Sequence, residues 1–334
     1  MKMHRLTIAV LATILALFTA CNQNNGKTAM AKTKEQTITY GVGRFVISIP
    51  VSMQYRGGTY SLRGRNIEEV VWPDKDADKA AEHAWEKRIE EIKSLPSPEG
   101  VDSALIEVKE IEDNRKWCKA ALYFNEPIDP DYGALDVLLN SGMTGVWIKA
   151  KDKKITAKSI VYEIATEIAK AYRPPTQRLG KAAVLMNLDA FYLEHGAIDL
   201  PFEYKESVDI GFKGHKLDDK LELSIETYVV QEIQQTGLID RLSAAIAAKF
   251  SPGVKVEKIR TKKRKVAGLE GEEVIIRGTE EGKTALNFQW NYPGRENAGH
   301  YPEIIIIMDS QDARLEEKIA LWDAILDSMH PAGR

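Results

Sequence analysis

YGVGRFVISIP, residues 40–50, places Phe45, Ile47 and Ile49 at every second position and ends at a proline. Alternation with a period of two is typical of a strand that has one buried face. Residues 192–201 (YLEHGAIDLP) close with a related apolar pattern and another proline. The sequence therefore predicts one strand near the start of each of two halves of the chain.

Two amphipathic helices are expected in each half. Apolar residues recur at spacings of three and four in residues 74–94 and 155–172, and again in residues 236–250 and 312–329. Such spacing gives each helix one apolar face. The corresponding elements of the two halves lie about 150 to 160 residues apart, which favours an internal duplication.

Strand-like runs separate the helices of each half. They are residues 104–111, 117–124 and 144–150 in the first half, and residues 220–230, 254–261, 272–278, 285–290 and 303–308 in the second. Loops of hairpin length between such runs favour antiparallel pairing. We predict an α+β protein of two similar domains, each an antiparallel sheet packed with two main helices.

The boundary between these domains is predicted at Arg173-Pro174-Pro175, because two adjacent prolines cannot continue a helix. The N-terminal domain is expected over residues 39–174 and the C-terminal domain over residues 178–331.

The first residues are typical of an export signal. Lys2 and Arg5 precede an uncharged, mostly apolar run at residues 6–18. A helix of that length rises about 20 Å, less than the roughly 30 Å of a bilayer core, so a signal peptide over residues 1–20 is favoured over a membrane span. Phe18 is too large for the −3 position of ordinary signal peptidase sites, and the segment that ends at Cys21 resembles a bacterial lipobox.

Lipidation of Cys21 would anchor the protein firmly, because two or more buried acyl chains are sufficient. Asn22 follows it and favours the periplasmic face of the outer membrane. Residues 21–38 are polar and are expected to form a flexible tether. The alternative is that Cys21 lies by chance near an ordinary cleavage site. The other cysteine, Cys118, is expected to be buried in a strand.

The composition excludes several classes of protein. Among 334 residues, 44% are hydrophobic and 28% are charged, with a formal net charge of −3. This is the balance of a folded domain, and it offers no bulk positive field for nucleic acid.

Residues 278–284 resemble a phosphate loop but are expected to form a hairpin turn, since a strand-like run follows. Residues 74–78 resemble a calcium loop but are expected to cap a helix.

No local motif marks a catalytic, cofactor or metal site. The sequence has no GxSxG, HExxH or CxxC, and no two histidines stand at ligand spacing. A hydrolase whose site is assembled from distant residues such as His195 and His300 remains the least favoured alternative. The basic run Lys262–Lys265 is expected to lie on a solvated strand or turn.

Two loops rich in polar and aromatic residues are the candidate partner-binding segments, residues 125–145 and 291–302. Aromatic and charged side chains on loops of a rigid scaffold suit protein recognition. The candidate contacts are Asp129, Asp131 and Tyr132 in the first loop and Tyr292, Arg295, Glu296 and Tyr301 in the second. Ordinary connecting loops are the alternative for either segment.

Four segments, in this order, resemble one family. They are GRFVISIP at residues 43–50, RKVAGLEGEEV at 264–274, FQWNYPGRENAGHYPEIIIIM at 288–308 and EKIALWDAILDSMHP at 317–331. This combination is similar to the Tli4 family, the immunity proteins of type VI secretion lipase effectors. The resemblance spans most of residues 40–331 and is more specific after residue 180.

The resemblance implies a periplasmic, two-domain α+β protein without catalytic activity of its own. Members bind a cognate phospholipase and block access to its active site or the opening of its lid. The expected partner is therefore a secreted lipase or phospholipase effector, and the acyl anchor adds a contact with the outer membrane. The alternative is a non-catalytic envelope lipoprotein that acts as a scaffold or a ligand-binding module.

Overall fold

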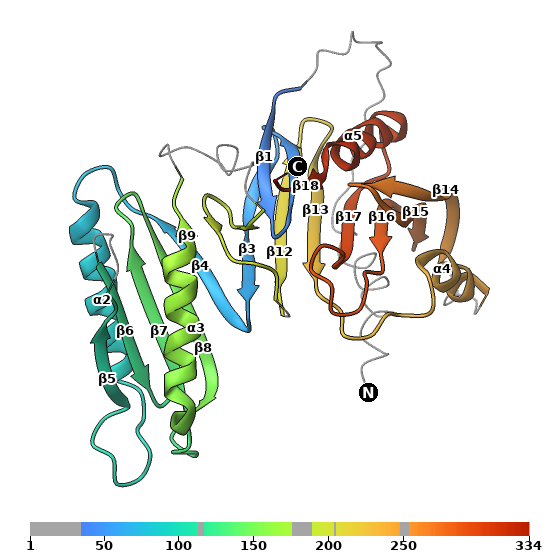
Figure 1. Cartoon of the computed structure of the whole chain (residues 1–334). Helices are drawn as coiled ribbons and strands as arrows, with labels where there is room; N and C mark the ends of the chain where they lie inside the picture. The colour runs from blue at the N-terminus through green and yellow to red at the C-terminus, as the bar shows by residue number, and fades with distance from the viewer. Residues whose placement is uncertain (1–34, 113–116, 176–188, 204, 248–253, 334) are drawn as a thin grey trace. The chain divides into compact units, whose positions relative to one another are not determined.

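The computed structural model describes residues 35–112, 117–175, 189–203, 205–247 and 254–333 (Figure 1). Cys21 and residues 1–20, predicted as the signal peptide, lie outside these ranges. No helix within them is both long and apolar enough to cross a bilayer.

The chain divides into two compact units. The C-terminal unit contains residues 209–331 and 47–58, and the N-terminal unit contains residues 59–208 and 40–46. The chain therefore passes from one unit to the other more than once. The domain ranges expected from the sequence, residues 39–174 and 178–331, stay a prediction.

The C-terminal unit is built on an antiparallel sheet. In sheet order its strands are β14 (Lys255–Val266), β15 (Leu269–Glu280), β16 (Lys283–Tyr292), β17 (Glu303–Gln311), β13 (Asp218–Tyr228) and β12 (Ser207–His215). The turn between β15 and β16 has φ of 49° at Glu281 and 77° at Gly282. Positive φ at both central residues is typical of a tight hairpin turn. Residues 278–284 are thus part of a hairpin, as predicted.

Helices cover both faces of this sheet. They are α4 (Leu238–Ala247) and α5 (Leu315–Ser328). Leu242 of α4 packs with Val274 on one face. On the other face, Trp322 of α5 contacts Phe288, with 5.8 Å between ring centroids. Neighbouring side chains of a strand point to opposite faces, so Glu273 points toward α5 while Val274 points toward α4.

The main strands of the N-terminal unit are also antiparallel. The second half of β3 (Gln54–Leu62) is followed in sheet order by β4 (Arg65–Val71), β8 (Thr144–Lys154), β7 (Tyr132–Asn140), β6 (Trp117–Tyr123) and β5 (Leu105–Glu110). The helices are α2 (Ala77–Lys93) and α3 (Lys158–Ala171), the latter preceded by a 3₁₀ turn (Ile155–Ala157). Trp85 of α2 stacks on Trp147, with 6.1 Å between centroids.

Three short strands complete the N-terminal unit: β9 (Tyr172–Arg173), β10 (Phe191–Tyr192) and β11 (Ala197–Ile198). The strands β1 (Thr37–Val42), β2 (Phe45–Pro50) and β18 (His330–Pro331) form a further small sheet.

The two units share one order of elements. Apart from the strands of the small sheets, two strands precede a helix in each unit, and four strands follow it before a second helix. The sheet order is also shared: β3-β4-β8-β7-β6-β5 corresponds to β12-β13-β17-β16-β15-β14. Four α-helices and mostly antiparallel sheets among the described residues confirm the predicted α+β class.

The prediction of one long loop at residues 125–145 was wrong. Residues 132–140 form β7, and every residue of this strand after Tyr132 is buried. A strand covered on both faces is apolar at nearly every position and lacks the alternation that identifies half-buried strands. Leu138 packs in the cluster below α2, while the neighbouring Val137 and Leu139 point to the other face, where α3 lies (Figure 1).

The prediction of single strands at residues 40–50 and 192–201 was also wrong. Gly43, with φ of 61°, separates β1 from β2, so the first segment is a pair of strands. In the second segment, β10 and β11 pair through Tyr192 and Ala197. Both segments turn back on themselves because their apolar runs are interrupted by glycine, which allows a tight reversal.

The start of α2 differs in detail from the expected helix cap. Asp76 is the N-cap residue, but it has φ of 61° and its carboxylate makes no capping hydrogen bond. Its oxygen Oδ1 instead lies 3.2 Å from Lys79 Nζ. The carboxylates at residues 74–78 still lie near the positive end of the helix dipole.

A buried ion pair joins α5 to the sheet. Lys318 Nζ lies 2.8 Å from Asp218 Oδ2, and both side chains are at most 1% exposed. Lys318 also donates to the Gln311 carbonyl at 2.6 Å. Loss of one member of such a pair leaves an uncompensated charge in the interior.

We expect Lys318→Met to lower the free energy of unfolding by about 3 to 5 kcal/mol, because Asp218 then loses its counter-charge. The double variant Lys318→Met/Asp218→Leu should recover part of the loss. Denaturant unfolding followed by circular dichroism measures both. Glu317→Ala, which removes an exposed ion pair with Arg314, is the control and should change stability by less than about 1 kcal/mol.

The pH dependence of the free energy of unfolding should reveal the ionisation of the Asp309 carboxyl. Burial raises the pKa of this carboxyl from 3.8 to about 7, although Asn287 donates to it at 2.8 Å. Between these two values the folded state holds a proton that the unfolded state releases, so the free energy of unfolding falls as pH rises from about 4 to 7. Asp309→Asn should reduce this fall, whereas the exposed control Asp102→Asn should not. Parallel profiles of Asp309→Asn and the parent would contradict the assignment.

Candidate partner-binding surface

The loop between β16 and β17, residues 293–302, is closed by backbone hydrogen bonds. Arg295 N–H donates to the Tyr301 carbonyl at 2.8 Å. Asn297 N–H donates to the carbonyl of Val230 at 2.8 Å. The loop is therefore tied both to itself and to the segment that follows β13. Such ties reduce the conformational freedom that the loop would lose on binding a partner.

A glycine and a buried carboxylate fix the base of this loop. Gly294 has φ of 81°, and a Cβ at this position would lie 2.7 Å from the Glu303 backbone nitrogen. The Glu303 side chain is buried, and Asn291 Nδ2 donates to it at 3.2 Å. The combined effect of burial and Glu303 raises the pKa of the Tyr228 hydroxyl.

Arg295 and Tyr301 of this loop lie together, beside Tyr292, which is the last residue of β16 and is buried. The Arg295 guanidinium lies 4.0 Å from the centroid of the Tyr301 ring, which is cation–π geometry. Burial raises the pKa of Tyr292, and the nearby Arg295 partly opposes that shift. Glu296 is exposed on the same loop. The loop thus presents a fixed cation, an aromatic face and a carboxylate, which together can recognise a protein surface.

The loop between β6 and β7 is anchored in a similar way. Asp131 N–H donates to Asp129 Oδ1 at 3.0 Å, and the Asp131 carbonyl accepts the Ile155 N–H at 2.8 Å. Asn125 Nδ2 donates to Asp152 Oδ1 at 3.0 Å. The Asp129 side chain therefore stabilises the loop. The Asp131 carboxylate is exposed, and its backbone is held in place by these hydrogen bonds.

Tyr132 lies at the first position of β7 and is 36% exposed. Sequence reasoning missed its neighbour Ile128, which is 87% exposed in the same loop. Ile128 lies between Pro127 and Pro130 in an acidic loop. From an apolar residue in that position, the exposure of its side chain could have been predicted. Exposed aliphatic and aromatic side chains in one loop can supply apolar contact area to a partner.

The two groups of predicted residues belong to different units. Asp129, Asp131 and Tyr132 lie in the N-terminal unit, and the residues of the β16–β17 loop lie in the C-terminal unit. Each loop connects two neighbouring antiparallel strands of its own sheet.

The remaining predicted positions have structural surroundings. Cys118 is buried in β6, as expected. The basic run Lys262–Lys265 lies on β14, where Arg264 donates to Glu273 Oε1 at 3.0 Å. Lys263 and Lys265 are exposed. This run therefore lies on a strand whose charges are partly paired.

His195 and His300, the residues of the hydrolase alternative, have different surroundings. The backbone N–H of His195 donates to Glu69 Oε2 at 2.8 Å, and Tyr172 OH donates to Glu69 Oε1 at 2.6 Å. Burial raises the pKa of Glu69 to about 7. His300 is exposed in the β16–β17 loop. Within the described ranges, no three His, Cys, Asp or Glu side chains form a group able to hold a metal ion.

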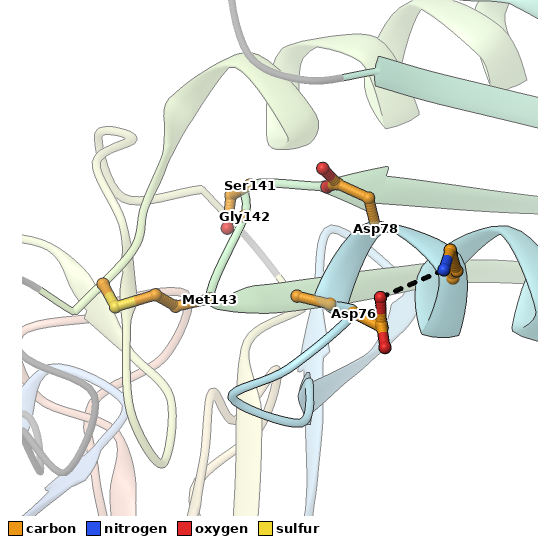
Figure 2. Close-up of a pocket in the computed structure, with 7 residues that line it drawn as sticks. Asp76, Asp78, Ser141, Gly142 and Met143 are labelled. Carbon is orange, nitrogen blue, oxygen red and sulfur yellow. Dashed lines mark ion pairs between the residues drawn. The ribbon is translucent and has the colours of Figure 1, made fainter.

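A pocket of about 570 Å³ lies at the start of α2 (Figure 2). Asp76, Asp78, Ser141, Gly142 and Met143 contribute to its lining. The carboxylates already have partners, since Asp76 pairs with Lys79 and Asn140 Nδ2 donates to Asp78 Oδ1 at 3.1 Å. Because both carboxylates already have partners, neither needs a ligand to neutralise its charge.

Comparison with known proteins identifies the fold. Residues 191–331 match the family described as Tle cognate immunity protein 4 C-terminal domain. No curated protein matches the chain in sequence.

Three solved structures share the fold. Immunity protein TplEi of the type VI secretion system (T6SS) of Pseudomonas aeruginosa is 18% identical with a TM-score of 0.73, over 91% of this chain and 99% of that chain. A chain of the Tle4–Tli4 complex is also 18% identical, with a TM-score of 0.72 over the same shares. TplEi complexed with "L" peptide is 19% identical, with a TM-score of 0.66 over 89% and 99% of the two chains.

At these identities the structural likeness establishes the fold, which is that of T6SS immunity proteins. The match to the family model is more specific than a shared fold, and the residues that it covers include the β16–β17 loop. Residues 191–331 are thus similar to the C-terminal domain of this family, in agreement with the resemblance found in the sequence.

Gly294→Ala should open the β16–β17 loop, because the new Cβ would meet the Glu303 backbone and the positive φ would be strained. Hydrogen exchange should become faster at the Arg295 and Asn297 amides. Gly268→Ala is the matched control: it also has a positive φ of 84°, but its Cβ would meet nothing within 4 Å. Unchanged exchange in the Gly294 variant would show that the loop does not depend on this glycine.

Proposed function

We propose that the protein is an immunity protein that binds and inhibits a cognate lipase effector of a type VI secretion system. The family match of residues 191–331 carries this proposal. A fold shared over 91% of the chain with TplEi, and with a chain of the Tle4–Tli4 complex, supports it.

The proposed inhibition is steric and needs no turnover. The protein would cover the entrance to the effector's active site or hold its lid closed. The loops that contain Asp131 and Arg295 would supply contacts. Both are anchored by backbone hydrogen bonds, so less conformational entropy is lost on binding than with mobile loops. Protection that outlasts a toxin requires tight binding, and a nanomolar Kd corresponds to about −12 kcal/mol.

The proposed location is the periplasm, with Cys21 lipidated and inserted in the inner leaflet of the outer membrane. The sequence of residues 18–22 supports this location. A tether would keep the inhibitor at a high local concentration where the effector arrives.

We also propose that the two units arose by duplication. Their shared order of helices and strands and their shared sheet order support this origin. Duplication would place an equivalent hairpin loop in each unit: β6–β7 corresponds to β15–β16, and β7–β8 to β16–β17. The predicted contacts therefore lie in loops that are not equivalent.

The direct test is binding of the purified chain to the lipase encoded beside it, measured by calorimetry together with lipase activity. The chain should bind stoichiometrically and abolish hydrolysis, because an occluded active site cannot receive lipid. Arg295→Ala should weaken binding by at least tenfold, since it removes the cation fixed on Tyr301. Asp131→Ala should weaken binding through loss of an exposed carboxylate on the other loop.

Lys283→Ala is the matched control for Arg295→Ala. Lys283 is an exposed cation at the opposite end of β16, about 30 Å along the strand from the β16–β17 loop. Absence of a complex at micromolar concentration would refute the proposed function. Equal affinities of the parent and both loop variants, with a complex present, would refute only the assignment of these contacts.

A further inference from the structure

Arginines with buried side chains in this protein have carboxylate partners, with one exception among the described residues. Arg44 donates through Nε to Glu206 at 3.0 Å, and Arg63 donates through Nη2 to Glu203 at 2.7 Å. Arg264 lies in the C-terminal unit and pairs with three carboxylates. A guanidinium stays charged at any ordinary pH, so each of these buried cations needs a nearby anion.

Arg65 is the exception. It is 6% exposed at the start of β4, beside the tight turn formed by Arg63 and Gly64. Its one hydrogen bond to a described residue runs from Nη1 to the Arg63 carbonyl at 2.9 Å. Its buried Nε has no hydrogen-bond partner in the described part of the chain. The carboxylates of Glu167 and Glu203, which pair with the neighbouring Arg63, are bound to that residue instead.

The charged neighbours of Arg65 include two lysines. Burial lowers the pKa of Lys153, and repulsion by Arg65 and by Lys205 lowers it further. The Lys205 Cδ atom lies 3.8 Å from the position of a Cβ built on Gly64, so the lysine stem passes over the turn beside Arg65. The exposed Asp152 opposes the shift of Lys153, but its Oδ1 also accepts a hydrogen bond from Asn125.

Three cations from three separate segments thus converge, and no buried counter-ion among the described residues faces them: Arg65 from β4, Lys153 from β8 and Lys205 from the segment before β12. All three belong to the N-terminal unit. Convergent like charges cost free energy in the empty protein, and such a cost is typical of a site whose ligand supplies the missing charge.

We propose that Arg65, Lys153 and Lys205 form a binding site for a phosphate group. A tetrahedral phosphate carries one to two negative charges and several acceptor oxygens, enough to accept a guanidinium hydrogen bond and two ammonium contacts. The source is either free inorganic phosphate or the headgroup of a phospholipid. The site does not depend on the proposed immunity function, since none of its residues lies in the two partner-binding loops.

The experiment titrates the full-length chain with inorganic phosphate at constant ionic strength, with chloride as the reference salt. Calorimetry gives the Kd, and thermal unfolding gives the shift in Tm. Phosphate should raise the Tm saturably, because a ligand of the folded state stabilises it. Short-chain phosphatidylglycerol is titrated in parallel, and the tighter of the two ligands identifies the source.

The double variant Lys153→Gln/Lys205→Gln tests the site itself. Neither lysine is fully buried, so the variant should fold. Its Kd for the tighter ligand should rise at least tenfold. Without ligand its Tm should equal or exceed that of the parent, since repulsion around Arg65 is relieved. Lys151→Gln removes an exposed cation from the same strand and should leave both quantities unchanged.

Two results would overturn the proposal. One is a Tm of the parent that responds to phosphate and to phosphatidylglycerol no more than to chloride. The other is a double variant that keeps the affinity of the parent. A double variant with a lower Tm in ligand-free buffer would also count against the proposal, because the lysines would then stabilise the empty protein.

Discussion

The Glu273 carboxylate is the contact on which the architecture of the C-terminal unit depends. This side chain is fully buried on β15, where an isolated negative charge would be strongly unfavourable. Arg260 and Arg264 of the edge strand β14 donate to its Oε1 at 2.6 and 3.0 Å, and Trp322 Nε1 of α5 donates at 2.7 Å. The charge is satisfied only when β14, β15 and α5 are all in place. One carboxylate therefore couples the edge of the sheet to the helix that covers it.

This requirement explains why two of the family-like segments are found together. Residues 264–274 contain Arg264 and Glu273, and residues 317–331 contain Trp322. These segments supply the donors and the acceptor of one buried network. The segment between them, residues 288–308, contains parts of β16 and β17 and the loop that joins them. A sheet held rigidly on both faces gives that loop a fixed base, which is what a tight inhibitor needs. The edge strand also carries exposed lysines, and these discourage pairing with other chains.

The N-terminal unit repeats this plan with different chemistry. Trp85 and Trp147 stack where α2 meets its sheet, and the Arg88 guanidinium pairs with the buried Asp136 at 2.7 Å. The same order of strands thus tolerates a largely apolar contact in one unit and an ion network in the other, because the hydrogen bonds of the sheet do not depend on the side chains. Arg65 stands apart from this pattern as a buried cation for which the described residues provide no carboxylate. The unit therefore combines a stable core with a charged site that a ligand would complete.

The sequence by itself determined the α+β class, the helices, several strands and the family, because amphipathic periodicity and ordered motifs are local properties of the chain. It could not reveal β7, since a strand buried on both faces has no alternation. It could indicate Arg295 and Tyr301 as candidate contacts, but their cation–π geometry depends on Gly294 and on hydrogen bonds that close the loop. Only the tertiary structure decided which charges meet: Glu273 accepts hydrogen bonds from Arg260 and Arg264, whereas Arg65 has no carboxylate partner among the described residues. Trp322 reaches Glu273 from 49 residues further along the chain, and no local pattern encodes that contact.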